Sequence, residues 1–124
     1  MEGMLMRLWM DDLRPAPEGY TRVYLVDETI SEIIRCNKET VFLMKQYILG
    51  YMDRALLEKC IKVFIIEEIS CDNDLGEGNA EGYKLLDWLE ATGRNYPIRI
   101  HSANPVARER MRAIIQRNGW KEVF

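Results

Sequence analysis

The chain has 124 residues, of which 48% are hydrophobic and 30% are charged, and its formal net charge is −3 at pH 7. This length predicts one domain over residues 1–124, with a core that needs no metal or disulfide for stability. Proteins that coat nucleic acid need a dense basic face, so the acidic balance argues against extended nucleic-acid binding. No apolar run approaches the roughly 20 residues of a membrane span.

The cysteines indicate a reducing compartment. Cys36, Cys60 and Cys71 are odd in number and show no CxxC spacing, so the pattern predicts neither a disulfide framework nor a zinc site. Residues 1–10 are too short and too interrupted by charge for a signal peptide. We therefore expect reduced thiols and a cytoplasmic protein.

Two strands and two helices are predicted in the first half of the chain. The residues before Asp11 are almost all apolar and predict a buried strand, and two prolines after it predict a loop. Apolar residues at helical spacing between Met44 and Ala55 predict a long helix, which Gly50 weakens without breaking. In order, the predicted elements are a strand at 4–10, a loop at 13–19, a strand at 21–26, a short helix from Asp27 and a helix at 40–61.

The second half alternates strands and helices in the same way. Glycines punctuate a loop before one helix, and Asn104 followed by Pro105 is typical of the start of another. Gly119 then predicts the end of that helix. In order, the predicted elements are a strand at 63–70, a loop at 75–79, a helix at 80–91, a strand at 97–101, a helix from Pro105 and a final strand within 120–124.

This alternation predicts the α/β class. We expect a single three-layer domain with a mainly parallel, flavodoxin-like sheet of four or five strands, helices on both faces, and an extra helix around residues 40–60. The three tryptophans, Trp9, Trp88 and Trp120, are expected in the core. In such sheets ligands bind outside the carboxyl ends of the strands, which is where the candidate site is sought.

Carboxylates follow two of the predicted strands. Asp11 and Asp12 end the first strand, and Asp72 and Asp74 follow the third. Carboxylates brought together repel one another unless they share protons or bind a cation, and Mg²⁺ prefers such oxygen ligands. The four aspartates therefore predict a site for Mg²⁺ or another divalent cation. The alternative is that they solvate loops or cap turns.

Residues that suit phosphate chemistry follow the fourth strand. His101 is the chain's only histidine, and its imidazole can exchange a proton near neutral pH. Ser102 and Asn104 could bind phosphate oxygens, as could Arg14 and Asn73 from the other strand ends. The alternatives are a structural role for His101, simple helix capping by Asn104, and pairing of Arg14 with a nearby aspartate.

Three motifs together resemble the cyclic-phosphate-processing receiver domain, a reduced relative of the response-regulator receiver. They are Leu8–Pro17 (LWMDDLRPAP), Ile69–Gly76 (ISCDNDLG) and Ile98–Pro105 (IRIHSANP). The resemblance spans nearly the whole chain and implies a receiver-like fold. It also implies a role in processing cyclic or terminal phosphates on nucleotides or RNA.

The same resemblance implies roles for individual residues. Asp11 and Asp12 would form the acidic pocket, and Asp72 would occupy the position of the phospho-accepting aspartate, supported by Asp74. His101 and Ser102 would fall at the Ser/Thr switch position. Two departures stand out: Asn73 replaces a histidine that is usual in the family, and the segment over 37–62 is longer than in typical members.

The sequence leaves three functions open. The first is metal-assisted hydrolysis of a cyclic or terminal phosphate, with His101, Asp72 and Asp12 as catalytic residues. The second is a non-catalytic receiver-like module that binds a nucleotide or accepts a phosphoryl group on Asp72. The third is an interaction protein that binds a partner through the helix at 40–60.

Overall fold

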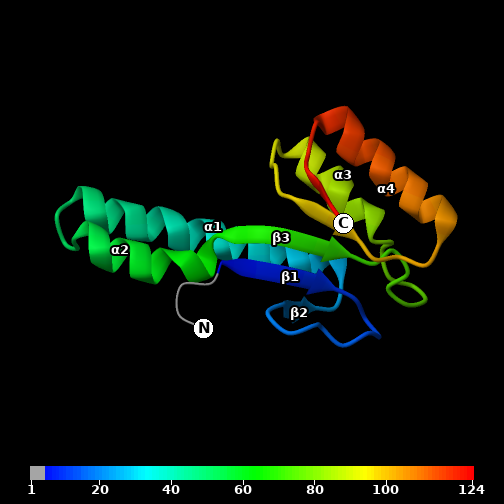
Figure 1. Ribbon diagram of the computed structural model, residues 1–124, viewed down its shortest axis with the longest axis horizontal. Helices are drawn as coiled ribbons and strands as arrows, with labels where there is room; N and C mark the ends of the chain where they lie inside the picture. Colours follow the sequence, from blue (N-terminus) through cyan, green and yellow to red (C-terminus); the bar gives the residue numbers. More distant parts are fainter. Residues whose placement is uncertain (1–4) are drawn as a thin grey trace.

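The structure, a computed structural model, describes residues 5–124 and contains one five-stranded parallel sheet (Figure 1). Its strand order is β2-β1-β3-β4-β5, the flavodoxin-like order. The α/β class and the parallel sheet predicted from the sequence are thereby confirmed. The strands are β1 (Met6–Met10), β2 (Thr21–Val23), β3 (Ile66–Cys71), β4 (Ile98–Ile100) and β5 (Glu122–Val123).

The hydrophobic core lies between this sheet and one layer of helices. The elements outside the sheet are α1 (Val26–Ile48), α2 (Arg54–Ile61), the 3₁₀ turn η1 (Lys62–Phe64), α3 (Tyr83–Ala91) and α4 (Pro105–Asn118). α3 contacts both α1 and α4, and all three bury side chains in the same core cluster as the sheet. Their crossovers all run in the same direction across the sheet, and right-handed crossovers of this kind place helices on one face. From the sheet, this core receives mainly Leu8, Met10, Ile69, Cys71 and Ile98.

The opposite face of the sheet carries no helix among the described residues. The alternate positions of β1, β3 and β4 point to it, and they are Arg7, Trp9, Glu68, Ser70 and Arg99. We call this surface the helix-free face. The prediction of helices on both faces was wrong here, because the one connection that runs in the opposite direction, from β1 to β2, is the proline-containing loop over 11–20 rather than a helix.

The extra helical segment forms a hairpin that projects beyond one end of the sheet (Figure 1). α1 runs from Val26 to Ile48, so the predicted short helix from Asp27 and the first part of the helix predicted at 40–61 form one helix. The rest of the helix predicted at 40–61 is α2. Gly50 adopts a φ of +83° in the turn, and Asp53 then caps α2 by accepting the N–H of Leu56. Gly50 therefore separates two helices rather than weakening one.

Smaller differences concern the ends of the elements. The 3₁₀ turn η1 shortens the predicted third strand, and the helix predicted from residue 80 begins at Tyr83. Met4, the first residue of the predicted first strand, lies outside the described residues. None of the described helices combines the length and the apolar character that a membrane span needs.

Candidate functional site

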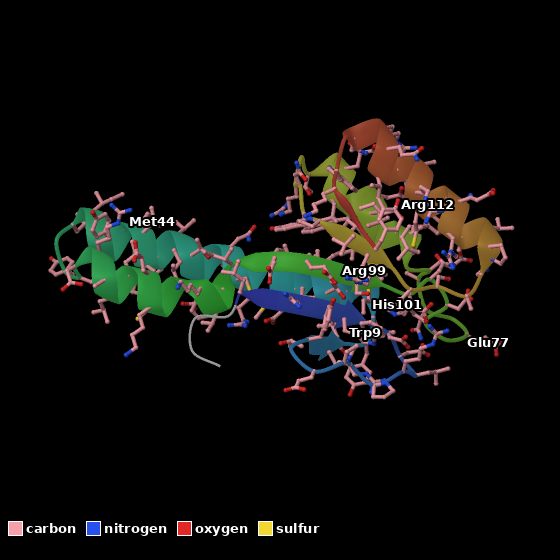
Figure 2. All side chains as sticks on the ribbon, viewed as in Figure 1. Trp9, Met44, Glu77, Arg99, His101 and Arg112 are labelled. Carbon is pink, nitrogen blue, oxygen red and sulfur yellow. The ribbon has the colours of Figure 1, made fainter. Side chains whose placement is uncertain are left out.

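The carboxyl ends of β1, β3 and β4 meet at one edge of the sheet. The N–H of Asp72 donates to the carbonyl of Met10 at 3.0 Å, and the N–H of His101 donates to the carbonyl of Cys71 at 3.0 Å. These bonds bring Asp11, Asp72 and His101 together, with one ligand atom of each within 4.8 Å of the others. Figure 2 shows His101 beside Trp9 at this edge, with Met44 far away on the hairpin.

Asp11 is fully buried and holds its carboxylate with three hydrogen bonds. Its Oδ1 accepts the N–H groups of Leu13 at 2.8 Å and Arg14 at 2.9 Å, and its Oδ2 lies 3.0 Å from Nε2 of His101. Burial raises the pKa of Asp11, but the two backbone N–H groups and His101 outweigh it, and the pKa is lowered overall. Asp11 is therefore ionised at neutral pH.

The ring of His101 is held on three sides. Nε2 faces Asp11, Nδ1 lies 2.8 Å from the hydroxyl of Ser70, and the ring stacks on Trp9 with centroids 3.8 Å apart and planes 5° from parallel. Burial lowers the pKa of His101, although the carboxylate of Asp11 opposes the shift. The imidazole is therefore neutral at neutral pH.

Asp72 completes the group of three, and its pKa is shifted in the opposite direction to that of Asp11. It is 8% exposed, and its Oδ1 accepts the N–H of Asn73 at 2.8 Å. Burial raises the pKa of Asp72 and the nearby charge of Asp11 adds to the rise, while Arg14 counteracts it. Two buried carboxylates at one point are mutually destabilising, and a bound cation would relieve their repulsion.

The residues present fit a divalent cation. Asp11 and Asp72 offer the oxygen ligands that Mg²⁺ prefers, and including the imidazole of His101 would extend the choice to metals such as Zn²⁺. Oδ1 of Asp12 is buried and accepts no hydrogen bond from the described residues. An unpaired buried carboxylate oxygen is costly, and a cation or its bound water would satisfy it.

The family follows from comparison with known proteins. Residues 6–117 match the family model described as the cyclic-phosphate processing receiver domain. The chain belongs to this family. No curated protein and no solved structure matches the chain.

Asn73, for which the resemblance implied a histidine, is held by the loop after β3 and the start of α3. Its side chain is 1% exposed, and its Oδ1 accepts the N–H of Tyr83 at 3.2 Å. Its Nδ2 donates to Asp74 at 3.4 Å and to Glu81 at 3.5 Å. Asn73 thus ties the loop after β3 to the start of α3, and its predicted role in phosphate binding stays a prediction.

Asp74 and Asp12 lie outside the group of three. Asp74 is exposed, and Asp12 directs Oδ2 toward the loop after β3, where a Cβ on Gly76 would lie 3.2 Å away. The structure therefore brings two of the four predicted metal ligands, Asp11 and Asp72, into one cluster. It adds His101, which was predicted only as a catalytic residue.

Three more predicted phosphate-binding residues, Arg14, Ser102 and Asn104, hydrogen-bond around the segment from His101 to the start of α4. The guanidinium of Arg14 is exposed and donates to the carbonyl of His101 at 2.8 Å. Asn104 caps α4 by accepting the N–H of Ala107 at 3.2 Å, and the buried hydroxyl of Ser102 accepts the N–H of Asn104 at 3.2 Å. Ser102 and Asn104 thus shape the turn at the start of α4, beside His101.

Two residues of the site were missed from the sequence. Trp9 was expected in the core, but it lies on the helix-free face against His101. Ser70 is fully buried at the edge of the same ring, beside Nδ1. Each residue lies two positions before a predicted site aspartate, Trp9 before Asp11 and Ser70 before Asp72, so strand alternation was the signal that could have found them.

Proposed function

We propose that this receiver domain hydrolyses a cyclic or terminal phosphate on a nucleotide or an RNA end with the help of a divalent cation. The observation that carries the proposal is the meeting of Asp11, Asp72 and His101, with ligand atoms within 4.8 Å, at the carboxyl edge of a parallel sheet. Membership of the cyclic-phosphate processing family supports the substrate class.

Asp11 and Asp72 would hold Mg²⁺ or another divalent cation, with Asp12 as a third carboxylate from the adjoining loop. When bound, the cation supplies charge neutralisation and polarisation of the phosphoryl group. Asp11 is already ionised and oriented by two backbone N–H groups, so this ligand needs little rearrangement.

His101 would protonate the leaving oxygen. An anionic phosphate beside the ring favours the imidazolium form, which can then give up a proton from the nitrogen that faces the pocket. Arg14, exposed at the rim, would bind the phosphate charge, with Ser102, Asn104 and Asn73 as further phosphate-binding residues. These assignments follow the predictions from the sequence.

The decisive experiment is incubation of the purified protein with 2′,3′-cyclic nucleotides and Mg²⁺, followed by ³¹P NMR. We expect a cyclic phosphate signal to convert to a monoester signal, and the conversion to stop in Asp72→Asn or after removal of divalent cations. A protein that binds Mg²⁺ but converts none of these substrates would contradict the proposed hydrolysis.

A non-catalytic receiver-like module is the second candidate. The observation that favours it concerns Asn73, which replaces the family's usual histidine. Its side chain is hydrogen-bonded to Glu81 and to the N–H of Tyr83, so it has a structural role in this protein. In this case a nucleotide would bind at the same edge, or Asp72 would accept a phosphoryl group. Thermal stabilisation by a nucleotide without turnover would support this reading over hydrolysis.

A protein-binding role for the hairpin is supported by its surface. Among residues 5–124, 14 large hydrophobic residues are more than a third exposed, and ten of these lie within residues 41–65, on or next to the hairpin. Among them are Phe42, Ile48 and Tyr51, exposed by 56%, 74% and 76%. Exposed apolar patches of this kind are typical of interaction surfaces.

Polar substitution separates this role from the chemistry at the sheet edge. We expect Phe42→Ser combined with Ile48→Ser and Tyr51→Ser to abolish association with a partner while cyclic-phosphate turnover is unchanged. Phe124→Ser is the matched control, because Phe124 is 89% exposed and far along the chain from the hairpin. Association that survives the triple substitution would contradict a binding role for the hairpin.

A further inference from the structure

Ser70 places a fully buried hydroxyl group beside the ring of His101. It lies in β3 between Ile69 and Cys71, which face the core, so its side chain points to the helix-free face. It is nevertheless fully buried, and its Oγ lies 2.8 Å from Nδ1 of His101. A buried hydroxyl is costly unless it is paired, so this bond accounts for the presence of a serine at this position.

The bond fixes which nitrogen of His101 faces the carboxylates. Stacking on Trp9 sets the plane of the ring, and Ser70 engages Nδ1. Nε2 is then left to face Asp11 at 3.0 Å, within the cluster that includes Asp72. The ring cannot turn Nε2 away without breaking both side-chain bonds.

The protonation of the two nitrogens follows from the partners. The ionised carboxylate of Asp11 can only accept, so Nε2 carries the proton in this arrangement. Nδ1 then carries no proton and accepts a hydrogen bond from the hydroxyl of Ser70. A serine hydroxyl can donate or accept by rotating about its C–O bond, so Ser70 would pair equally well with an Nδ1 that carries the proton.

We propose that Ser70 is a positioning residue whose hydroxyl reverses from donor to acceptor, so that Nε2 of His101 can be either an N–H donor to Asp11 or a bare nitrogen that binds a divalent cation. This inference rests on the proposed cation site, and it makes the two roles of His101 alternatives. A ring that binds the cation through Nε2 has no proton there to give, so the acid proposed above is the form that keeps its Nε2–H toward Asp11. The change moves one proton of the neutral ring from Nε2 to Nδ1 through solvent, and the number of protons stays the same. In the second form Nδ1–H donates to Oγ of Ser70, as the outer hydrogen bond of a metal-bound histidine commonly does.

The test is NMR of the full chain with ¹⁵N-labelled histidine, without substrate. His101 is the only histidine, so its two ring nitrogens give the only imidazole signals. The probe is Zn²⁺, which is diamagnetic and binds imidazole well, at pH 8, where a free imidazole is already neutral. A Cys60→Ser background removes the one thiol that is not buried.

We expect the proton to be on Nε2 before Zn²⁺ is added and on Nδ1 at saturation. Ser70→Ala, which leaves Nδ1–H without an acceptor, should weaken Zn²⁺ binding by about 10- to 100-fold. Thr29→Val is the matched control, because it removes another fully buried hydroxyl, one that donates to the carbonyl of Leu25. It should bind Zn²⁺ as the parent protein does, and Ser70→Thr, which keeps a hydroxyl, should recover binding.

Three results would overturn part of this scheme, and they are distinguishable. Zinc that binds while Nε2 keeps its proton shows that His101 is not a ligand and that Ser70 does not reverse. Unchanged affinity in Ser70→Ala removes the positioning role. No binding of Zn²⁺ to the parent protein refutes the cation site itself. The proton assignment in the parent protein needs no variant, so a Ser70→Ala protein that fails to fold leaves the first test intact.

Discussion

The side chain of His101 is the hydrogen-bond partner of two buried polar groups, the hydroxyl of Ser70 and the carboxylate of Asp11. Replacing it with Ala leaves the buried hydroxyl of Ser70 and one oxygen of Asp11 without their partner, and removes the ring that covers Trp9. Buried groups left unpaired cost about 1–3 kcal/mol, so His101→Ala should lower the free energy of unfolding by about this amount.

Urea unfolding at pH 7.5 measures this loss. His101→Gln is the control, because its amide keeps a donor in place of Nε2 and should lose less stability than Ala. A His101→Ala protein as stable as the parent would show that the hydrogen bonds to Ser70 and Asp11 contribute nothing in solution.

The lowered pKa of His101 makes stability depend on pH in a defined direction. Since the folded protein binds this proton less readily than the unfolded chain, stability is full above the ordinary value of 6.5 and falls as pH drops toward the folded pKa. Asp11 acts in the same direction in a lower window: its stabilisation is present above 3.8 and is lost as pH falls through its lowered pKa. Asp72, with a raised pKa, acts in the opposite direction between its folded pKa and 3.8.

Comparison of the parent protein with His101→Gln isolates the contribution of the histidine. The difference in unfolding free energy between the two should be constant above pH 7 and should narrow below pH 6.5. Denaturation in urea at pH 8, 7, 6 and 5 gives the difference directly. A difference that widens on acidification would mean that the folded pKa of His101 is raised.

At the scale of residues, the sequence located the three clustered side chains of the candidate site but not the residues that hold His101 in place. Asp11, Asp72 and His101 could be predicted because each directly follows a recognisable strand, and strand ends of a parallel sheet meet. Strand alternation puts Ser70 and Trp9 on the same face as these aspartates, but their roles were missed because the sequence does not show that this face lacks a helix. The roles of the individual residues remain predictions.

Among the elements, the loop from β3 to α3 depends on close packing at Gly82. The N–H of Gly82 donates to the carbonyl of Asn73 at 2.8 Å, and a Cβ on Gly82 would lie 1.9 Å from the carbonyl oxygen of Asp72. Gly82→Ala must therefore displace the backbone of Asp72. Overpacking of this kind costs about 1–3 kcal/mol, and we expect weaker cation binding as well.

Gly78→Ala provides the comparison within the same loop. Gly78 has a φ of +81° but open space around it, so its substitution strains the backbone by about 1–2 kcal/mol without touching Asp72. Thermal unfolding and titration with Mn²⁺ measure the two effects separately. Equal cation affinity in the two variants would contradict the link between Gly82 and the site.

The helices show how far periodicity carries a prediction. It located α3 and α4, because each presents an apolar stripe to the core, and it predicted helical structure over residues 40–61. It failed at Gly50, where the same spacing continues through a turn: the apolar residues on either side belong to two helices that pack together. Helical spacing of apolar residues cannot show that the chain reverses direction between them. The positive φ of Gly50 marks the reversal, but it is known only from the structure.

In the whole molecule, the helix-free face explains why the site combines aspartates that follow the strands with Trp9 and Ser70, the last residues but one of β1 and β3. In a sheet covered on both faces, the positions of Trp9 and Ser70 would pack against a helix. Here they support the ring of His101 instead. The sequence could not reveal this, because strand alternation distinguishes two faces but does not say which one the helices cover.

The stability of the whole molecule should respond to divalent cations. A ligand that binds only the folded state adds about 2.7 kcal/mol of stability at 100 times its Kd, so Mg²⁺ should raise the melting temperature in a concentration-dependent way. The effect should be larger at pH 8 than at pH 5, because protons compete with the cation at Asp72, whose pKa is raised, and because acidification charges the neighbouring imidazole of His101.

Differential scanning fluorimetry over a series of Mg²⁺ concentrations measures this effect. Asp72→Asn is the matched control: it should melt at or above the temperature of the cation-free parent, because it removes one of two repelling buried carboxylates, and it should no longer respond to Mg²⁺. The contrary outcome is a parent protein that melts at the same temperature with and without Mg²⁺, together with an Asp72→Asn protein that melts above the parent. It would show that protonation, and not a cation, relieves the repulsion between Asp11 and Asp72.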